Sequence, residues 1–410
     1  MKPLFISALY HPDMIGGAEK VAQIVAEGMR DAGHDPVVAT TSAQPGVRVD
    51  VVNGVKVYYI GLKNIYWPHD RKSRPAAVKP VWHIIDRHNP WMAHAIGSIL
   101  DRERPDVVNT HSLTGFSCAV WPAIQRRRVP LVHTLHDYSL LCPKTSMFRN
   151  GANCGTQCTA CKLYSVPSRY HSACVDAVVG VSRHTLERHL AQGFFRQSGI
   201  RRVIYNGLAE APRPPVAPAR REQPLRLGYV GQLIPSKGIA QLVRVMQAWP
   251  SSQCSLTVAG RGSAEFEQLL RREAPANVSF VGFVDPSDVY REIDVLVVPS
   301  LWEEPFGMIV LEAYMHGVPV IAARRGGLAE IVDQGRTGML YEPADATGLQ
   351  NAITALVRDR ALISRFQPWV AEKARYFVSE RMRSEYLNVL ERARARAGFD
   401  GAQRSARSLQ

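Results

Sequence analysis

Short apolar runs alternate with longer amphipathic stretches along most of the chain. The apolar runs suit strands that are buried on both faces, and the amphipathic stretches suit helices that cover them. This alternation is typical of a parallel sheet with helices on both sides, so the pattern predicts an α/β fold. The expected strands are residues 4–9, 36–41, 55–60, 106–110, 131–135 and 177–181, followed by 225–230, 255–259, 278–281, 295–298 and 319–322.

Two doubly wound domains account for the length of the chain. Its 410 residues exceed one ordinary core and suit about two domains of about 150 to 200 residues. Residues 209–224 contain five prolines, which helices and central strands reject, so this stretch is predicted to be the linker. The predicted order is a first domain at 1–208, the linker 209–224, a second domain at 225–366, C-terminal helices at 367–397 and a disordered tail at 398–410. Packing of the C-terminal helices against the first domain stays open. The apolar pattern predicts one helix at 346–366, at the end of the second domain, and another at 379–397.

The charge of the chain favours an anionic partner without naming it. The formal net charge is +14 at pH 7, with arginine clusters at 126–128, 201–202 and 220–221. Phosphate groups and an anionic bilayer surface are both consistent with this charge, and so is a merely solvated basic surface. Nucleic acid is not expected as a partner, because the arginines are scattered over loops and helix ends.

The sequence contains no pattern typical of export or of a membrane span. The first residues reach Pro12 before the apolar core of a signal peptide could form. No run approaches the roughly 20 apolar residues of a spanning helix. We therefore expect a cytoplasmic protein, and a peripheral position on the inner face of the membrane stays open.

The strand at 295–298 leads into the most informative loop of the chain, residues 299–307, which a helix up to His316 follows. Ligands bind at this end of an open parallel sheet, and the free N–H groups near Gly307 suit phosphate. Glu304 lies in the loop, and Glu312 lies about 7.5 Å further along the helix axis from Gly307. The two carboxylates could hold one ligand at two depths, or they could be ordinary solvated or capping acids.

An ordered set of motifs resembles the large retaining glycosyltransferase family 4. The resemblance covers nearly the whole chain and implies a GT-B fold, in which two Rossmann-like domains face each other across a cleft. The matching motifs are Gly16-Gly17-Ala18-Glu19, Val181-Ser182, Asn206-Gly207, Gly231 through Lys237-Gly238, Gly260-Arg261-Gly262, Gly282-Phe283, Pro299 through Ala313, Gly317 through Val320, Gly326-Gly327 and Gly338.

The resemblance assigns roles in the second domain. It implies that Glu312 binds the ribose hydroxyls of the donor and that Glu304 contacts the transferred sugar near the reacting centre. It implies that Lys237 neutralises the leaving diphosphate in place of a divalent metal, so no cofactor is expected for catalysis. The backbone N–H groups that would hold sugar and phosphate oxygens are those of Phe306, Gly307, Met308 and Ile309.

The resemblance also assigns roles in the first domain. The pair Gly16 and Gly17 would lie near the donor phosphates and the acceptor, although a glycine pair alone indicates only a turn. His136, at the end of the strand 131–135, matches the family histidine that touches the transferred sugar. His133 suits a packed position within the strand, and His111 is a weaker candidate for the acceptor side.

Gln232 departs from the family pattern, because many members carry an arginine there as the second cation for the diphosphate. Glutamine can donate hydrogen bonds but brings no charge. We hypothesise that Arg261, in another strand-end loop, supplies part of the missing charge.

Four of the seven cysteines lie within twenty residues, at Cys142, Cys154, Cys158 and Cys161. Disulfides are disfavoured in a protein that is not exported, so the cluster predicts a structural zinc site. An iron–sulfur cluster and unligated buried thiols are the alternatives. A similar insertion in some family members implies that residues 142–161 lie on the acceptor side.

The expected function is therefore a retaining, hexosyltransferase-type enzyme that uses a nucleotide-diphosphate sugar. The acceptor would be a glycan or lipid-linked glycan in cell-envelope or exopolysaccharide biosynthesis. A noncatalytic nucleotide-sugar-binding partner protein and an epimerase on the same fold stay open. A dinucleotide-dependent oxidoreductase is disfavoured, because the motif that begins at Gly260 lacks its third glycine.

Overall fold

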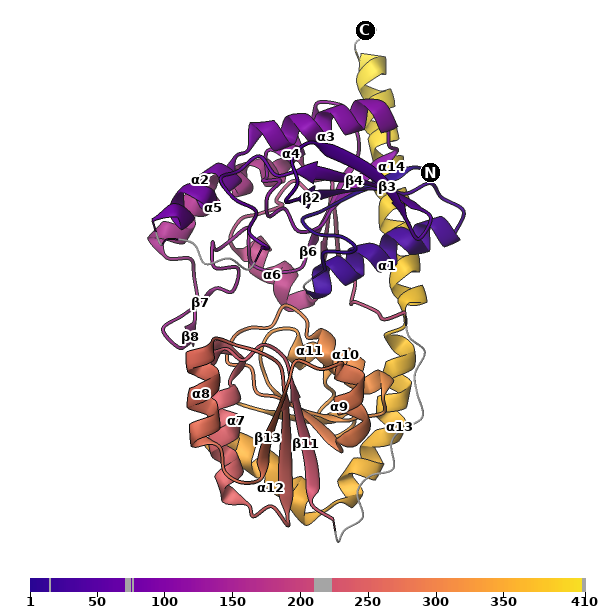
Figure 1. Ribbon diagram of the computed structural model, residues 1–410. Coiled ribbons are helices and arrows are strands. Elements are labelled where there is room, and N and C mark those ends of the chain that lie inside the picture. The colour runs from indigo at the N-terminus through magenta and orange to yellow at the C-terminus, as the bar shows by residue number, and fades with distance from the viewer. Residues whose placement is uncertain (15, 71–74, 76, 210–222, 408–410) are drawn as a thin grey trace. The chain divides into compact units, whose positions relative to one another are not determined.

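The computed structural model describes residues 1–14, 16–70, 75, 77–209 and 223–407 (Figure 1). The chain divides into two compact units. Unit 1 comprises Met1–Ser146, Thr156–Asn206 and Ser379–Gln410, and unit 2 comprises Met147–Gly155 and Gly207–Val378. The predicted linker falls almost entirely on residues 210–222, which lie outside the described residues.

Unit 1 is built on an eight-stranded sheet with the order β10-β9-β6-β5-β1-β2-β4-β3. Every described pair in it is parallel except the antiparallel pair of β3 and β4. The strands are β1 (Pro3–Ser7), β2 (Val37–Ser42), β3 (Val47–Val52), β4 (Val55–Gly61), β5 (Val107–Thr110), β6 (Leu131–Leu135), β9 (Ala177–Gly180) and β10 (Ile200–Val203). The α-helices are α1 (Gly17–Asp31), α2 (Val78–Arg87), α3 (Pro90–Glu103), α4 (Val120–Gln125), α5 (Thr159–His171), α6 (Arg183–Ala191) and α14 (Ser379–Arg407).

Unit 2 is built on a six-stranded parallel sheet with the order β13-β12-β11-β14-β15-β16. Its strands are β11 (Leu225–Val230), β12 (Cys254–Ala259), β13 (Val278–Gly282), β14 (Val295–Val298), β15 (Val320–Ala323) and β16 (Gly338–Tyr341). Its α-helices are α7 (Ile239–Val245), α8 (Ala264–Glu273), α9 (Pro286–Glu292), α10 (Met308–Met315), α11 (Leu328–Ile331), α12 (Gly348–Arg358) and α13 (Ala361–Tyr376). A small hairpin of β7 (Phe148–Arg149) and β8 (Ala152–Asn153) also groups with unit 2.

The strand order of unit 2 creates a topological switch point. Successive strands from β11 to β13 extend the sheet in one direction, and those from β14 to β16 extend it in the other. The loops that follow β11 and β14 therefore diverge at the carboxyl edge of the sheet. In open α/β sheets this divergence opens the crevice in which ligands bind.

Two expectations for the C-terminal region are wrong. The helix expected at 346–366 is two helices, because the backbone of Asp359 is extended and its Oδ1 accepts a hydrogen bond from the Ala361 N–H at the start of α13. The tail expected at 398–410 is helical as far as Arg407, where α14 continues through a stretch that has no proline to stop it. Residues 408–410 lie outside the described residues.

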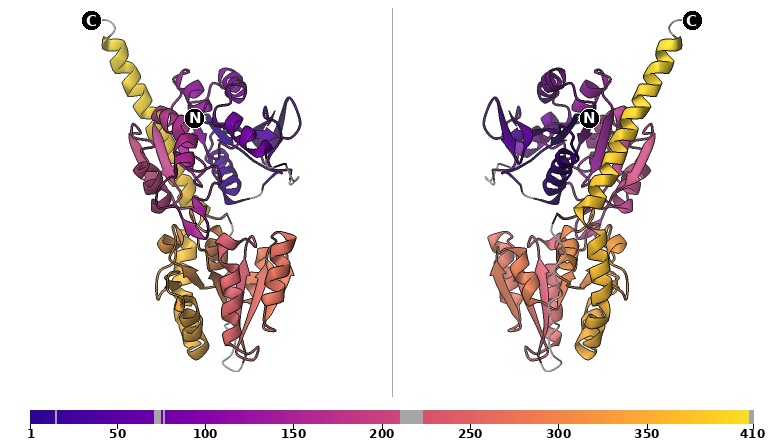
Figure 2. Two further views of the ribbon diagram at one scale, coloured as in Figure 1. Left: turned by 90° about the vertical axis from the view of Figure 1, so that its left-hand side faces the viewer. Right: turned by 90° about the vertical axis from the view of Figure 1, so that its right-hand side faces the viewer.

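The helix α14 completes the core of unit 1. Buried side chains recur along it at helical spacing, namely Met382, Tyr386, Val389, Leu390 and Ala393. They join the core cluster of Phe5, Val107 and Val132, and the helix packs against α1, β5 and β6. Figure 2 shows α14 along one side of unit 1.

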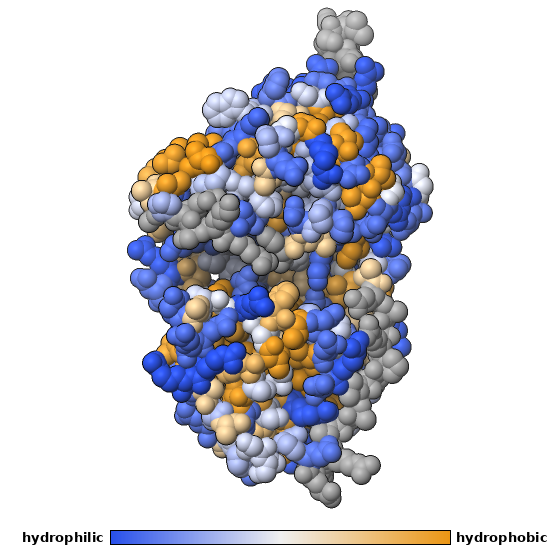
Figure 3. Space-filling view, viewed as in Figure 1, coloured by the Kyte–Doolittle hydropathy of each residue, from blue (hydrophilic) through white to orange (hydrophobic). Residues whose placement is uncertain are grey.

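Among the described residues, no helix is long and apolar enough to cross a membrane. The face of the molecule seen in Figure 3 mixes hydrophilic side chains with apolar groups, some of which gather over α2 and α5.

Candidate active site

The loops after β11 and β14 bring Lys237 and Glu304 together at the switch point of unit 2. Lys237 Nζ lies 2.6 Å from Glu304 Oε1, although 67 positions separate the two residues in sequence. The hydroxyl of Ser300 donates to the same carboxylate oxygen at 2.5 Å. The Glu304 side chain is only 8% exposed, so the ammonium and the hydroxyl compensate a carboxylate that is largely removed from water.

Backbone contacts fix the position of Glu304. Its carbonyl accepts a hydrogen bond from the Gly327 N–H at 2.7 Å, in the loop after β15. The neighbouring Glu303 carboxylate accepts a hydrogen bond from the Gly326 N–H. Gly326 has a φ of +50°, and a Cβ there would lie 2.2 Å from the Glu304 carbonyl oxygen. Only glycine lets the two loops approach this closely.

The loop after β11 is held against the same segment. Ser236 O accepts a hydrogen bond from Leu301 N at 2.9 Å. Gly238 has a φ of +72°, and a Cβ there would lie 1.8 Å from Pro299 O. The glycine next to Lys237 therefore allows the contact that brings its ammonium to Glu304.

The helix α10 begins directly after Gly307, a position that requires glycine. Gly307 has a φ of +110°, and a Cβ there would lie 2.6 Å from Leu328 Cδ2. The Phe306 side chain is buried and its ring packs edge-on against Phe377, so the predicted role of Phe306 can involve only its backbone. Met308 and Ile309 are half-buried at the start of α10, which points toward the carboxyl edge of the sheet.

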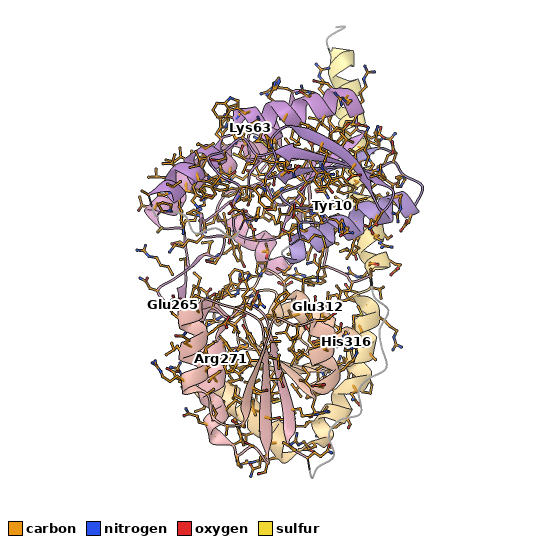
Figure 4. The ribbon with its side chains drawn as sticks, in the orientation of Figure 1. Tyr10, Lys63, Glu265, Arg271, Glu312 and His316 are labelled. Atoms are coloured by element: carbon orange, nitrogen blue, oxygen red, sulfur yellow. The ribbon has the colours of Figure 1, made fainter. Side chains whose placement is uncertain are left out.

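Glu312 has partners that differ from those of Glu304. Its Oε2 accepts a hydrogen bond from the Tyr290 hydroxyl at 3.2 Å. Its carbonyl contacts the Nδ1 atom of His316, the residue directly after α10, at 2.8 Å (Figure 4). Burial, reinforced by the Glu312 charge, raises the pKa of Tyr290 well above its ordinary value, so this phenol stays a hydrogen-bond donor. The two glutamates thus occupy separate surroundings, as two distinct roles would require.

Gln232 and Arg261 lie in adjoining loops. The Leu233 N–H donates to Arg261 O at 2.8 Å, which joins the segment next to Gln232 to the loop after β12. A Cβ at Gly260 would lie only 1.8 Å from Gly231 O, so these loops also meet through glycine. Both side chains are exposed, and the Arg261 guanidinium lies 5.7 Å from the centre of the Phe283 ring. The arrangement is compatible with the hypothesis that Arg261 supplies charge that Gln232 lacks.

In unit 1, the predicted glycine pair forms the start of α1. Gly17 is the first residue of the helix, and the Gly16 N–H donates to Glu19 Oε2 at 2.9 Å. Burial raises the pKa of the Glu19 carboxyl. The Glu19 carboxylate therefore caps the Gly16 N–H at the start of α1, a contact that the sequence did not lead us to expect.

His136 forms a pair with His111 at the carboxyl ends of β6 and β5. His136 Nε2 lies 2.8 Å from His111 Nδ1, and the rings stack with centroids 5.1 Å apart. Burial lowers the pKa of His136 to about 3 and that of His111 well below its ordinary value, so both imidazoles are neutral near pH 7. His133 lies within β6 against Trp121 and Phe195, in the packed position expected of it.

No disulfide bond links the four clustered cysteines. Burial raises the pKa of Cys161 to about 12, and the neighbouring Cys142 and Cys158 act in the same direction. Cys154 is on the hairpin that groups with unit 2. No set of three or more His, Cys, Asp or Glu side chains is arranged to hold a metal ion in the described part of the chain. The structural zinc therefore gains no support.

Asn153 is the site residue that the sequence analysis missed. Its Nδ2 donates to Leu301 O at 2.7 Å and its Oδ1 accepts from Glu303 N at 2.9 Å, so one side chain fixes the backbone just before Glu304. The turn of its hairpin is Asn150-Gly151, and both residues have a positive φ. Asn-Gly is a strong hairpin signal, so the turn could have been found in the sequence.

Comparison with known proteins decides the family. The model for "Glycosyl transferase 4-like domain" matches residues 16–207, and that for "Glycosyl transferases group 1" matches residues 224–359. An uncharacterized 42.6 kDa protein in the cps region of Klebsiella pneumoniae is 31% identical over 81% of this chain and 87% of its own length. The chain belongs to the group 1, GT4-like glycosyltransferases. This confirms the predicted family and enzyme class.

Relatives and solved structures support the GT-B fold of this glycosyltransferase. Glycogen synthase of Mycobacterium tuberculosis is 29% identical over 89% of this chain and 88% of its own. Sucrose-phosphate synthase of Thermosynechococcus elongatus superposes with a TM-score of 0.74 at 21% identity, covering 96% of this chain and all of the other. Anabaena HepE, solved with UDP and glucose, has a TM-score of 0.68 at 19% identity over 95% and 99%. The predicted α/β, GT-B architecture is confirmed.

Proposed function

We propose that this glycosyltransferase transfers a hexose-type sugar from a nucleotide-diphosphate sugar, with retention at the anomeric carbon. The acceptor is a glycan or a lipid-linked glycan in envelope or exopolysaccharide assembly. The observation that carries the proposal is the Lys237–Glu304 pair at the switch point of unit 2. The relative in the cps region supports the polysaccharide setting, and the UDP and glucose bound by HepE support the class of donor.

The pair suggests how binding and transfer are coupled. The donor diphosphate is a stronger partner for the Lys237 ammonium than a single carboxylate, because it carries more negative charge. As Lys237 turns to the diphosphate, Glu304 becomes available to accept hydrogen bonds from hydroxyls of the transferred sugar. Ser300 holds the carboxylate in place during this exchange. Lys237 then stabilises the charge that develops on the leaving phosphate.

The remaining site residues complete the proposed donor site. Glu312 accepts the ribose hydroxyls while Tyr290 orients its carboxylate. The N–H groups at the start of α10 hold sugar and phosphate oxygens. Neutral His136, paired with His111, offers a hydrogen bond to the sugar from unit 1, with Gly16 and Gly17 near the phosphates.

A thermal-shift screen of UDP-, GDP- and ADP-sugars, followed by product analysis with the best donor, tests the proposal. We expect a glycan product that keeps the anomeric configuration of the donor. Conversion of the donor sugar without transfer would establish the epimerase instead. Donor binding with no product from any glycan or lipid-linked acceptor would establish the noncatalytic binding protein.

Two experiments test separately whether transfer requires a divalent metal ion and whether the chain binds a structural zinc ion. Because the Lys237 ammonium would neutralise the negative charge of the diphosphate in place of a metal ion, we expect the transfer rate to be unchanged in EDTA. A loss of transfer that Mg²⁺ or Mn²⁺ restores would contradict this role of Lys237. Elemental analysis of protein purified without chelators tests the structural zinc separately, and absence of bound zinc would remove it.

A further inference from the structure

The helices α2 and α5 of unit 1 pack against each other through polar and aromatic side chains. Arg87 Nη2 donates to Ser168 Oγ at 2.8 Å, and the Arg87 guanidinium lies 3.4 Å from the centre of the Tyr164 ring. The His83 ring contacts the same tyrosine edge-on. Polar and aromatic side chains therefore make the contact between α2 and α5, whereas two amphipathic helices usually pack through their apolar faces.

The apolar side chains of these two helices face outward instead. On α2, Val81 and Ile84 are 48% and 70% exposed, at a spacing of three residues. On α5, Leu163, Val166 and Tyr170 are 70%, 50% and 78% exposed, at spacings of three and four. These spacings place each set on one face of its helix. Figure 3 shows apolar side chains gathered over α2 and α5, at the upper left of the view. Single exposed apolar residues are ordinary, but stripes on two adjoining helices form a binding surface.

The exposed charges of α2 and α5 have one sign. Lys79 and Lys162 are exposed beside the apolar stripes. The two helices contain a single carboxylate, Asp86, which is buried and accepts a hydrogen bond from the Gly115 N–H at 2.7 Å. No carboxylate of α2 or α5 therefore reaches the outer face, in a chain whose net charge is +14.

We propose that the outer face of α2 and α5 docks on the surface of an anionic bilayer. Apolar side chains that enter the acyl boundary, flanked by lysines at the level of the headgroups, are the mark of an interfacial helix. A second copy of the same face would place lysine against lysine, so the charge favours anionic lipid over self-association. The inference is independent of the donor site in unit 2, because a chain with no transferase activity could bind lipid through the same face.

Co-sedimentation of the full chain with lipid vesicles tests this surface. We expect the chain to bind vesicles of phosphatidylcholine with one-third phosphatidylglycerol at least tenfold more tightly than vesicles of phosphatidylcholine alone. Ile84→Glu with Leu163→Glu should weaken binding to the anionic vesicles at least tenfold. Val51→Glu is the matched control, because Val51 is 66% exposed on the edge strand β3, and it should bind as the wild type does.

A second variant keeps the test valid if the double substitution disturbs folding. Leu163→Trp adds an aromatic side chain that prefers the membrane interface, and it should bind the anionic vesicles at least as tightly as the wild type. Equal binding of the wild type to both kinds of vesicle, or unchanged binding of the double variant, would overturn the proposal. A dimer of the wild type that the double variant converts to monomer, without vesicle binding, would assign the face to self-association instead.

Discussion

The Lys237–Glu304 pair shows how unit 2 keeps charge at the end of an apolar sheet. A carboxylate as buried as Glu304 is costly unless it is paired and hydrogen-bonded, and both partners are present. Removing Lys237 would leave that carboxylate uncompensated, so its substitution would alter folding and function together. Glu304 and Glu312, whose partners are distinct, are better residues at which to separate donor binding from transfer.

The proposal that Arg261 supplies the positive charge that Gln232 lacks can be tested by moving the arginine from one position to the other. Arg261→Ala should raise the donor Kd roughly tenfold, which is about 1.4 kcal/mol for one charge-assisted contact. Adding Gln232→Arg to that variant should restore much of the affinity, because the two loops adjoin. Isothermal titration with the best donor measures both effects. Arg271→Ala on α8 is the control, since its guanidinium lies over Phe280 within the same unit. Unchanged affinity in Arg261→Ala would rule out the compensation.

Asp86 predicts a dependence of stability on pH. Burial raises the pKa of its carboxyl to about 7 in the folded chain, from an ordinary value of 3.8. The folded state therefore binds this proton more tightly, and the stability that results is present at about pH 4 and lost as the pH rises through 7. Asp86→Asn removes the ionisation, and its amide oxygen can still accept from Gly115.

Thermal or urea unfolding at two pH values measures the effect of Asp86. At pH 8, Asp86→Asn should raise the free energy of unfolding by about 2 to 4 kcal/mol relative to the wild type. At pH 4 the two proteins should be nearly equal. Asp101→Asn, an exposed partner of Arg127, is the control and should give no gain at pH 8. The opposite sign at pH 8 would contradict the assignment.

At the scale of elements, the central strands and the edge strand β13 could be predicted, whereas the edge strands β3, β10 and β16 could not. The runs that became β6, β11 and β14 are buried on both faces, so hydrophobicity alone marks them. β3 and β10 lie at the edges of their sheet, and charged residues interrupt their apolar positions. β16 begins with glycine and its two middle residues are only half-buried, so it lacks the pattern of a fully buried strand. The contacts among strand-end loops, such as Gly326 with Glu304, depend on residues far apart in sequence and have no local signal.

The β7–β8 hairpin yields a prediction about transfer. Asn153→Ala removes two hydrogen bonds to the backbone before Glu304, and we expect kcat to fall between about threefold and thirtyfold with little change in donor Kd. Asn153→Asp should have a smaller effect, because it still accepts from the Glu303 N–H. Arg149→Ala, exposed on the same hairpin, is the control and should leave kcat unchanged. A rise in KM alone would show that Asn153 does not position Glu304.

At the scale of the whole molecule, the sequence predicts the architecture of the two units but not which distant segments complete each unit. Two doubly wound sheets and the family could be recognised from alternation and ordered motifs. The return of α14 to unit 1 required knowledge of which surface its apolar stripe covers, because Met382 and Tyr386 join a core made by strands from β1 to β10, far earlier in the chain. The assignment of the β7–β8 hairpin to unit 2 likewise depends on tertiary contacts that no local pattern encodes.

The central claim is that the two glutamates of unit 2 have different tasks, and parallel measurement of donor Kd and single-turnover rate tests it most directly. Glu312→Ala should weaken donor binding roughly tenfold to a hundredfold and change the rate with saturating donor by less than threefold. Glu304→Ala should lower that rate at least a hundredfold and change donor Kd far less, and exposed Glu292→Ala should alter neither. Equal effects of the two active-site substitutions on both quantities would contradict the account.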